Sequence, residues 1–234
     1  MPKRMMLIAT LAALFAAGCG DDKKPAGTTP ATTSTATETT APAQEKDAAG
    51  CVIVAAPDAR GPGKEAKPKV KLSAIKAYTV TMKTNCGEIV IALDVKRAPK
   101  TAASFASLVD KGFYDGLTFH RVLADFVIQG GDPLGNGQGG PGYNVIEKPP
   151  ADLRYRRGVV AMAKAGVDPP GASGSQFFIV TAEDAGLPPD YALVGKVKSG
   201  FGAINRIVAE PVDGPAGVPN SPIVIEKATI EPGL

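Results

Sequence analysis

The sequence predicts a mainly β domain, a closed eight-stranded antiparallel β-barrel capped by two α-helices. From residue 78 onward, eight short apolar or alternating runs occur, only two stretches have helical periodicity, and the regular strand–helix alternation of a parallel sheet is absent. Barrel closure removes exposed edge strands, which favours this arrangement. The runs span residues 78–82, 88–93, 118–122, 126–129, 158–163, 176–180, 192–197 and 222–230.

The first elements of this domain are a hairpin and a helix. Residues 85–87, Asn-Cys-Gly, form a turn signal between the first two runs, so these strands should pair antiparallel. A helical pattern opens at Pro99, places Phe105 and Leu108 on one face, and ends at Gly112. The second helical stretch is 201–209.

The N-terminus has the layout of a secretory signal. Lys3-Arg4 precedes an apolar run, residues 5–17, which is shorter than the about 20 residues of a membrane span. Ala16-Ala17-Gly18-Cys19 resembles the lipobox of bacterial lipoproteins, which implies that residues 1–18 are a signal peptide and that Cys19 carries lipid. The alternative is an uncleaved anchor or a buried apolar helix.

Three segments follow the signal. Residues 19–50 are rich in Thr, Ala and Pro and poor in large apolar residues, which predicts a disordered tether. Residues 51–76 form a lead-in segment, and residues 77–234 have the composition of one packed domain. Loss of the signal would lower the number of basic residues from 26 to 24, against 23 acidic ones. Near-neutral charge, with no aromatics among the lysines of 64–71, argues against nucleic-acid binding.

Cysteine and histidine usage restricts the bonds that the chain can form. With Cys19 lipidated, Cys51 and Cys86 remain, and in an exported protein they are a candidate disulfide, with two free thiols as the alternative. Two distant cysteines and a single histidine, His120, do not make a recognisable ligand set, so no metal site is expected.

Several long motifs give the domain a resemblance to the cyclophilins, which are peptidyl-prolyl cis-trans isomerases. They are PKTAASF, FHRVLADFVIQGGD, GNGQGG, GSQFFIVTA and LVGKV, in this order between about residues 78 and 230. The resemblance implies an eight-stranded barrel with two helices, a substrate groove on the outside of the barrel, and no cofactor.

The resemblance also implies the site residues. Arg121 matches the family's catalytic arginine, Phe126 and Phe178 match aromatic walls of the proline pocket, and Gln129 matches a glutamine that holds the substrate backbone. The full set matching the substrate groove is Phe126, Val127, Gln129, Gly137, Ala163, Lys164, Ala165, Gln176, Phe178, Leu187 and Tyr191.

These residue types suit a reaction without a nucleophile. Rotation about an X-Pro bond loses amide resonance against a barrier of roughly 20 kcal/mol, but breaks no covalent bond. An apolar slot for the proline ring and a fixed donor such as Arg121 can favour the twisted amide. Phe119 and Phe177 are expected in the barrel core, and His120 should face away from its neighbour Arg121, in a buried or capping role.

The chain departs from the family at a few groove positions. Gly186 stands where many cyclophilins have a tryptophan that helps to bind cyclosporin, and the chain contains no tryptophan. Lys164 stands where asparagine is frequent, Tyr191 where histidine is common, and Ser104 replaces a frequent asparagine in the first helix.

Two functions from different classes fit these features. The first is an isomerase that accelerates X-Pro isomerisation in exported polypeptides as they fold, anchored by lipid on Cys19 to the outer face of a bacterial cell membrane. The second is a binding or chaperone module that captures proline-containing segments in the same groove without turnover. Arg121 favours the enzyme, because simple capture would not require it. A compact barrel behind a tether is expected to be a monomer.

Overall fold

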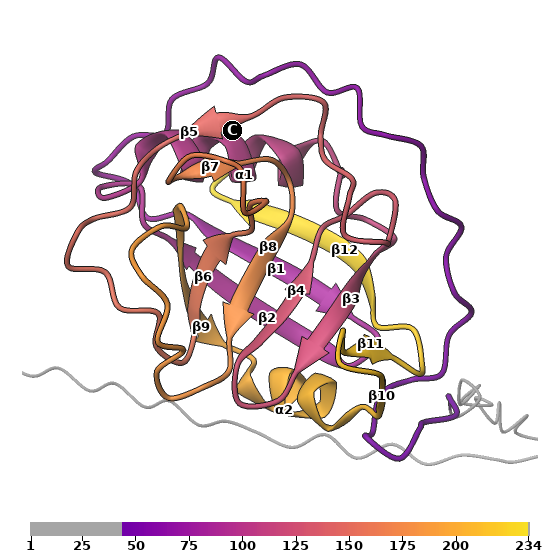
Figure 1. The fold of residues 1–234 in the computed structure, drawn as a ribbon. Coiled ribbons are helices and arrows are strands. Elements are labelled where there is room, and N and C mark those ends of the chain that lie inside the picture. The colour runs from indigo at the N-terminus through magenta and orange to yellow at the C-terminus, as the bar shows by residue number, and fades with distance from the viewer. Residues whose placement is uncertain (1–43, 234) are drawn as a thin grey trace, which may run out of the picture. The chain divides into compact units, whose positions relative to one another are not determined.

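The computed structural model describes residues 44–233, and its central feature is a closed β-barrel (Figure 1). Eight strands follow the order β1-β12-β3-β4-β8-β6-β9-β2 and pair antiparallel throughout. The predicted fold class and all eight predicted strand positions are confirmed. The barrel strands are β1 (Thr79–Thr84), β2 (Gly87–Leu93), β3 (Leu117–Leu123), β4 (Val127–Gly130), β6 (Val159–Met162), β8 (Phe177–Val180), β9 (Leu193–Ser199) and β12 (Val224–Glu231).

Two helices and two small ribbons complete the domain. Helix α1 (Pro99–Asp110) begins with the predicted proline, and α2 (Phe201–Ala209) has the predicted bounds. They lie at opposite ends of the barrel (Figure 1). The ribbons pair β5 (Val145–Ile146) with β7 (Ala172–Ser173) and β10 (Val212–Asp213) with β11 (Val218–Pro219). Sequence periodicity did not indicate them, because two residues define no period.

The barrel interior is filled by aromatic and branched side chains. Phe105 of α1 packs against Tyr114 and Phe177, with ring centroids 5.1 and 5.5 Å apart, and Phe119 lies edge-on to Phe177 at 5.7 Å. Phe119 and Phe177 are therefore core residues, as predicted. Phe178 belongs to a separate apolar cluster outside the barrel, as expected for the next residue of a strand.

A β-bulge in β3 decides where Arg121 points. Phe119 pairs with Gly130 and Arg121 with Gln129, so His120 is an extra residue without a partner on β4. Strict alternation would place Arg121 on the same side as buried Phe119. The bulge changes the phase, so that Phe119 and Val122 both point inward and Arg121 lies on the groove side.

The bulge also overturns the expected orientation of His120. His120 and Arg121 line the same cavity of about 310 Å³, instead of facing opposite sides. Both ring nitrogens of His120 are buried and have no hydrogen-bond partner among the described residues. Burial lowers the pKa of His120; nearby Asp132 opposes this change and Arg121 adds to it. Of the buried and capping roles expected for His120, the described residues therefore show the buried one.

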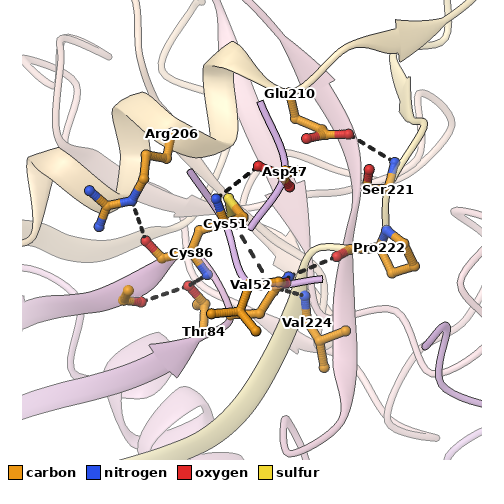
Figure 2. The surroundings of a disulfide bond; sticks show 12 residues. Asp47, Cys51, Val52, Thr84, Cys86, Arg206, Glu210, Ser221, Pro222 and Val224 are labelled. Carbon is orange, nitrogen blue, oxygen red and sulfur yellow. Dashed lines mark hydrogen bonds between the residues drawn. A yellow bond between two sulfur atoms is a disulfide. The ribbon is translucent and has the colours of Figure 1, made fainter. Parts of the chain in front are cut away.

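The lead-in segment runs along the outside of the barrel before it enters β1 (Figure 1). Its first residue, Cys51, is bonded to Cys86 in the β1–β2 turn, with Cα atoms 4.1 Å apart (Figure 2). The chain is already ordered before Cys51, because Ile53 N donates to Glu45 O at 2.9 Å and Cys51 N to Asp47 Oδ1 at 2.8 Å. Residues 45–50, which the sequence analysis assigned to the tether, therefore make hydrogen bonds with the start of the lead-in segment.

Three sequence predictions fall wholly or mostly in residues that the structure does not describe, and one of them is the tether, of which residues 19–43 lie outside the described range. The signal peptide, residues 1–18, and the lipid site Cys19 lie outside the described range. Within residues 44–233, no helix has both the length and the apolar character needed to cross a membrane.

Candidate active site

The site is a groove on the outer surface of the barrel, built from two adjoining hollows. The first has a volume of about 150 Å³ and is lined by Arg121, Phe126, Val127, Gln129, Ala163, Lys164, Phe178, Leu187 and Tyr191. The second, of about 480 Å³, shares Gln129, Ala163 and Lys164 with it and adds Gly137, Ala165 and Gln176. Every residue that the sequence assigned to the groove therefore lines one hollow or both.

Strands and a tight turn set the apolar walls of the first hollow. Val127 of β4 and Phe178 of β8 are buried, with 3% and 4% of their surface exposed, and form the base. Phe126 precedes β4 and follows Asp125, whose φ of 55° turns the chain at the end of the β3–β4 hairpin. Leu187 and Tyr191 come from the loop between β8 and β9 and pack on the same apolar cluster. These side chains can hold a compact apolar ring.

Arg121 is half-buried at the edge of this hollow. Its Cζ lies 6.0 Å from the centroid of the Phe126 ring, a distance at which a cation still interacts with an aromatic face. Its Nη1 donates only a long hydrogen bond, 3.4 Å, to Gln129 Oε1. None of the five ion pairs among residues 44–233 involves Arg121. Most of its five N–H donors are therefore open to another group.

Glutamine side chains connect Arg121 to the second hollow. Gln129 Nε2 donates to Gln176 Oε1 at 2.9 Å, and Gln176 Nε2 donates to the carbonyl oxygens of Gly137 and Gly139 at 2.9 and 2.8 Å. Because each bond fixes the orientation of the next amide, Gln129 Oε1 is directed towards Arg121. The network therefore links Gln129, in β4, through Gln176 to the glycine-rich loop that carries Gly137 and Gly139.

A buried tyrosine, which sequence reasoning missed, fixes the far wall. Tyr155 Oη donates to Tyr191 O at 2.6 Å and accepts a hydrogen bond from Tyr191 N at 3.0 Å. Burial raises the pKa of Tyr155 to about 12, so the hydroxyl keeps its proton. The Tyr191 ring stands edge-on to Phe178 at 5.4 Å. Only the fold brings residue 155 next to residue 191, so no local pattern marked it.

Lys164, which stands where asparagine is frequent in the family, uses its side chain to connect two loops of the groove. Its side chain is 6% exposed, its Nζ pairs with Asp190 Oδ2 at 2.9 Å, and the same Nζ lies 5.6 Å from the Tyr191 ring centroid. It also donates to Asp168 O at 3.1 Å. Lys164 thus joins the loop after β6 to the loop that carries Tyr191, and Asp190 is a second residue that the sequence did not single out.

Comparison with known proteins identifies the groove. Residues 79–230 match the family model described as cyclophilin type peptidyl-prolyl cis-trans isomerase/CLD, which covers more than half of the chain. The chain belongs to the cyclophilin family. It is therefore a peptidyl-prolyl cis-trans isomerase, and the groove on its barrel is the candidate active site.

This cyclophilin is similar to fungal and bacterial isomerases. It is 40% identical over 141 residues to peptidyl-prolyl cis-trans isomerase-like 1 of Neurospora crassa, spanning 58% of this chain and 85% of the relative. It is 38% identical over 178 residues to peptidyl-prolyl cis-trans isomerase A of Mycobacterium tuberculosis, spanning 68% of this chain and 94% of the relative.

A solved structure has the same fold. The crystal structure of a Cryptosporidium parvum cyclophilin type peptidyl-prolyl cis-trans isomerase, determined in the presence of the dipeptide Ala-Pro, aligns with a TM-score of 0.61 and 34% identity. The match covers 65% of this chain and 98% of that one. No group of three or more metal-ligating side chains occurs in the described part of this cyclophilin.

Cyclosporin should inhibit this cyclophilin weakly. Gly186 is exposed, and a side chain added there would meet no atom within 4 Å, so the site lacks the indole wall that helps to bind the drug. Titration of cyclosporin into a prolyl-peptide assay would measure the effect. Inhibition at nanomolar concentration would contradict this expectation.

Proposed function

We propose that Arg121 is the catalytic residue and that the smaller hollow receives the proline ring. The observation that supports this most directly is the position of the Arg121 guanidinium, which has no ion-pair partner among residues 44–233 and lies beside Phe126 at the edge of an apolar hollow. Rotation about the X-Pro bond moves electron density back onto the imide nitrogen, since amide resonance is lost. A donor bonded to the proline carbonyl or close to that nitrogen stabilises this twisted state more than either planar isomer.

The polar groups next to Arg121 hold the peptide while the bond turns. Gln129 lies between the two hollows and is fixed by Gln176, so its amide is oriented before a substrate arrives. A preorganised hydrogen-bonding group of this kind restrains one side of the rotating bond without reorganisation. The related Cryptosporidium structure was determined with Ala-Pro, which supports proline-containing polypeptides as the substrate class of this chain.

The compartment is a further proposal. The basic and apolar N-terminus ending at Cys19 supports export and lipid anchoring on the outer face of a bacterial membrane. The Cys51–Cys86 bond is consistent with an oxidising location, where disulfides persist. Substrates there would be exported polypeptides, whose slow X-Pro steps limit folding.

Folding kinetics test this function. The full chain should accelerate the proline-limited refolding phase of an exported polypeptide, and the slow phase should shorten in proportion to the chain's concentration. A folded chain that leaves the slow phase unchanged would contradict the proposed substrate class.

Cell fractionation tests the anchor. In a bacterium that processes lipoproteins, the chain should be recovered with membranes and carry labelled fatty acid, whereas Cys19→Ser should carry none. Incorporation of label into Cys19→Ser, or a wild-type chain without label, would contradict lipidation at Cys19.

A further inference from the structure

We propose that residues 60–65 of the lead-in segment, here called the strap, support one wall of the groove. These residues lie outside the region that matches the family. The family match begins at residue 79, so the strap is an addition to the isomerase fold. Its position against the glycine-rich loop 133–141 makes it a positioning element for the second hollow. This inference rests on the proposed function of the groove.

The strap is bonded along the outer side of that loop. Arg60 N donates to Pro133 O at 2.8 Å, Gly63 N to Gly140 O at 3.1 Å, and Glu65 N to Pro141 O at 2.7 Å. Both ends of the strap are fixed by side chains to the connection between α1 and β3: Arg60 Nη1 donates to Phe113 O at 2.9 Å, and Glu65 pairs with Lys111 at 2.7 Å. Strap and loop therefore form a small ribbon that is anchored at two points.

The inner side of the same loop lines the groove. The carbonyl oxygens of Gly137 and Gly139 accept the hydrogen bonds of Gln176, which in turn binds Gln129, the partner of Arg121. The loop is thus held between the strap outside and Gln176 inside. A shift of the loop would move Gln176 and change the support of Gln129.

The loop needs such support because of its composition. Residues 135–140 are Gly-Asn-Gly-Gln-Gly-Gly, and Gly137 has a φ of 85°. A glycine-rich segment loses much conformational entropy when it is held in one conformation. Buried Asp132 caps one part of it, accepting hydrogen bonds from Leu134 N and Asn136 N at 2.8 and 2.9 Å. In the remaining part, Gly140 and Pro141 are bonded by the strap.

Close contact makes the strap sensitive to one methyl group. A Cβ at Gly63 would lie 2.5 Å from Gly140 O and 2.7 Å from Pro141 Cα, both backbone atoms that cannot turn aside. Gly63→Ala must therefore push the strap and the loop apart. Gly61 gives a matched control, since a Cβ there would meet no atom within 4 Å and its φ is not positive.

Steady-state kinetics of the full chain on an X-Pro peptide test the proposal. Gly63→Ala should lower kcat/KM about tenfold, mainly through a higher KM, because a misplaced wall weakens binding. Gly61→Ala should stay roughly within twofold of wild type. Arg60→Ala removes one anchor without adding bulk and should have the same effect in a smaller degree, with partial recovery in Arg60→Lys.

Hydrogen exchange separates positioning from simple stability. In Gly63→Ala, segment 133–141 should exchange faster at a temperature where the barrel strands remain protected. Wild-type kcat/KM in a folded Gly63→Ala, an equal loss in Gly61→Ala, or unchanged exchange of 133–141 would each overturn the proposal. If the wild-type chain did not isomerise the peptide at all, the proposed function would fail, while the exchange result would still decide whether the strap holds the loop.

Discussion

Arg121→Ala is expected to lower kcat/KM for an X-Pro peptide by about 10²–10³-fold, the loss typical of removing one preorganised donor from a transition state. The structure gives the reason. Arg121 has no carboxylate partner among residues 44–233 and bonds only weakly to Gln129, so its guanidinium is available to the substrate. Peptide isomerisation measured at several substrate concentrations should show the loss in kcat, with a smaller change in KM.

Arg157→Ala is the matched control for this experiment. Arg157 Cζ lies 5.6 Å from the centroid of Phe201, so it repeats the arginine–phenylalanine contact of Arg121 with Phe126 at a position that lines neither hollow. Its removal should leave kcat/KM roughly unchanged. Arg121→Lys keeps the charge but loses the planar fork, and we expect it to recover only a small part of the activity. Full activity in a folded Arg121→Ala would refute the catalytic assignment.

The barrel could be predicted from the sequence because each of its strands corresponds to a short, separate run of apolar or alternating residues. Phe177 and Phe178 illustrate why this worked: adjacent residues of a strand face opposite sides, and one fills the barrel while the other lines the groove. The groove residues themselves came from motif resemblance, and pattern alone would have identified few of them. Lys164 shows the limit, since its partner Asp190 is distant in sequence.

Strand alternation could not predict the orientation of Arg121, which only the family resemblance placed in the groove, because this orientation depends on a bulge. The run around Phe119 and Val122 suggests a regular strand, and nothing in its residue types marks His120 as the extra residue. The bulge is a property of the pairing between β3 and β4, which a single sequence does not reveal.

The strap was missed for a similar reason. Its bonds to residues 133–141 are made by backbone atoms, and these leave little trace in side-chain composition.

Loss of the Cys51–Cys86 disulfide should lower the free energy of unfolding by roughly 4 kcal/mol, from a loop of 35 residues in the chain-entropy model. For a domain of this size the midpoint of thermal unfolding should fall by about 10 °C. We expect this in the double variant Cys51→Ala/Cys86→Ala. Alanine is preferred to serine because the two cysteines are only 1% and 2% exposed, and a buried hydroxyl would add a cost of its own.

The surroundings of the disulfide explain why its loss should leave the barrel folded but should loosen the start of the lead-in segment. Arg206 of α2 donates to Cys86 O at 2.7 Å (Figure 2), and Asn85 Nδ2 donates to Val52 O and Pro222 O at 2.8 and 3.0 Å. These bonds keep the β1–β2 turn in place without the sulfur bridge, whereas residues 45–53 would retain fewer constraints.

A reductant supplies the internal control. It should lower the unfolding midpoint of the wild-type chain towards that of the double variant and leave the variant unchanged. Two observations would contradict the account: equal midpoints for the oxidised wild type and the variant, or a reductant effect of the same size on both. The first would mean that Asn85 and Arg206 alone hold the segment, and the second that the reductant acts elsewhere than on this bond.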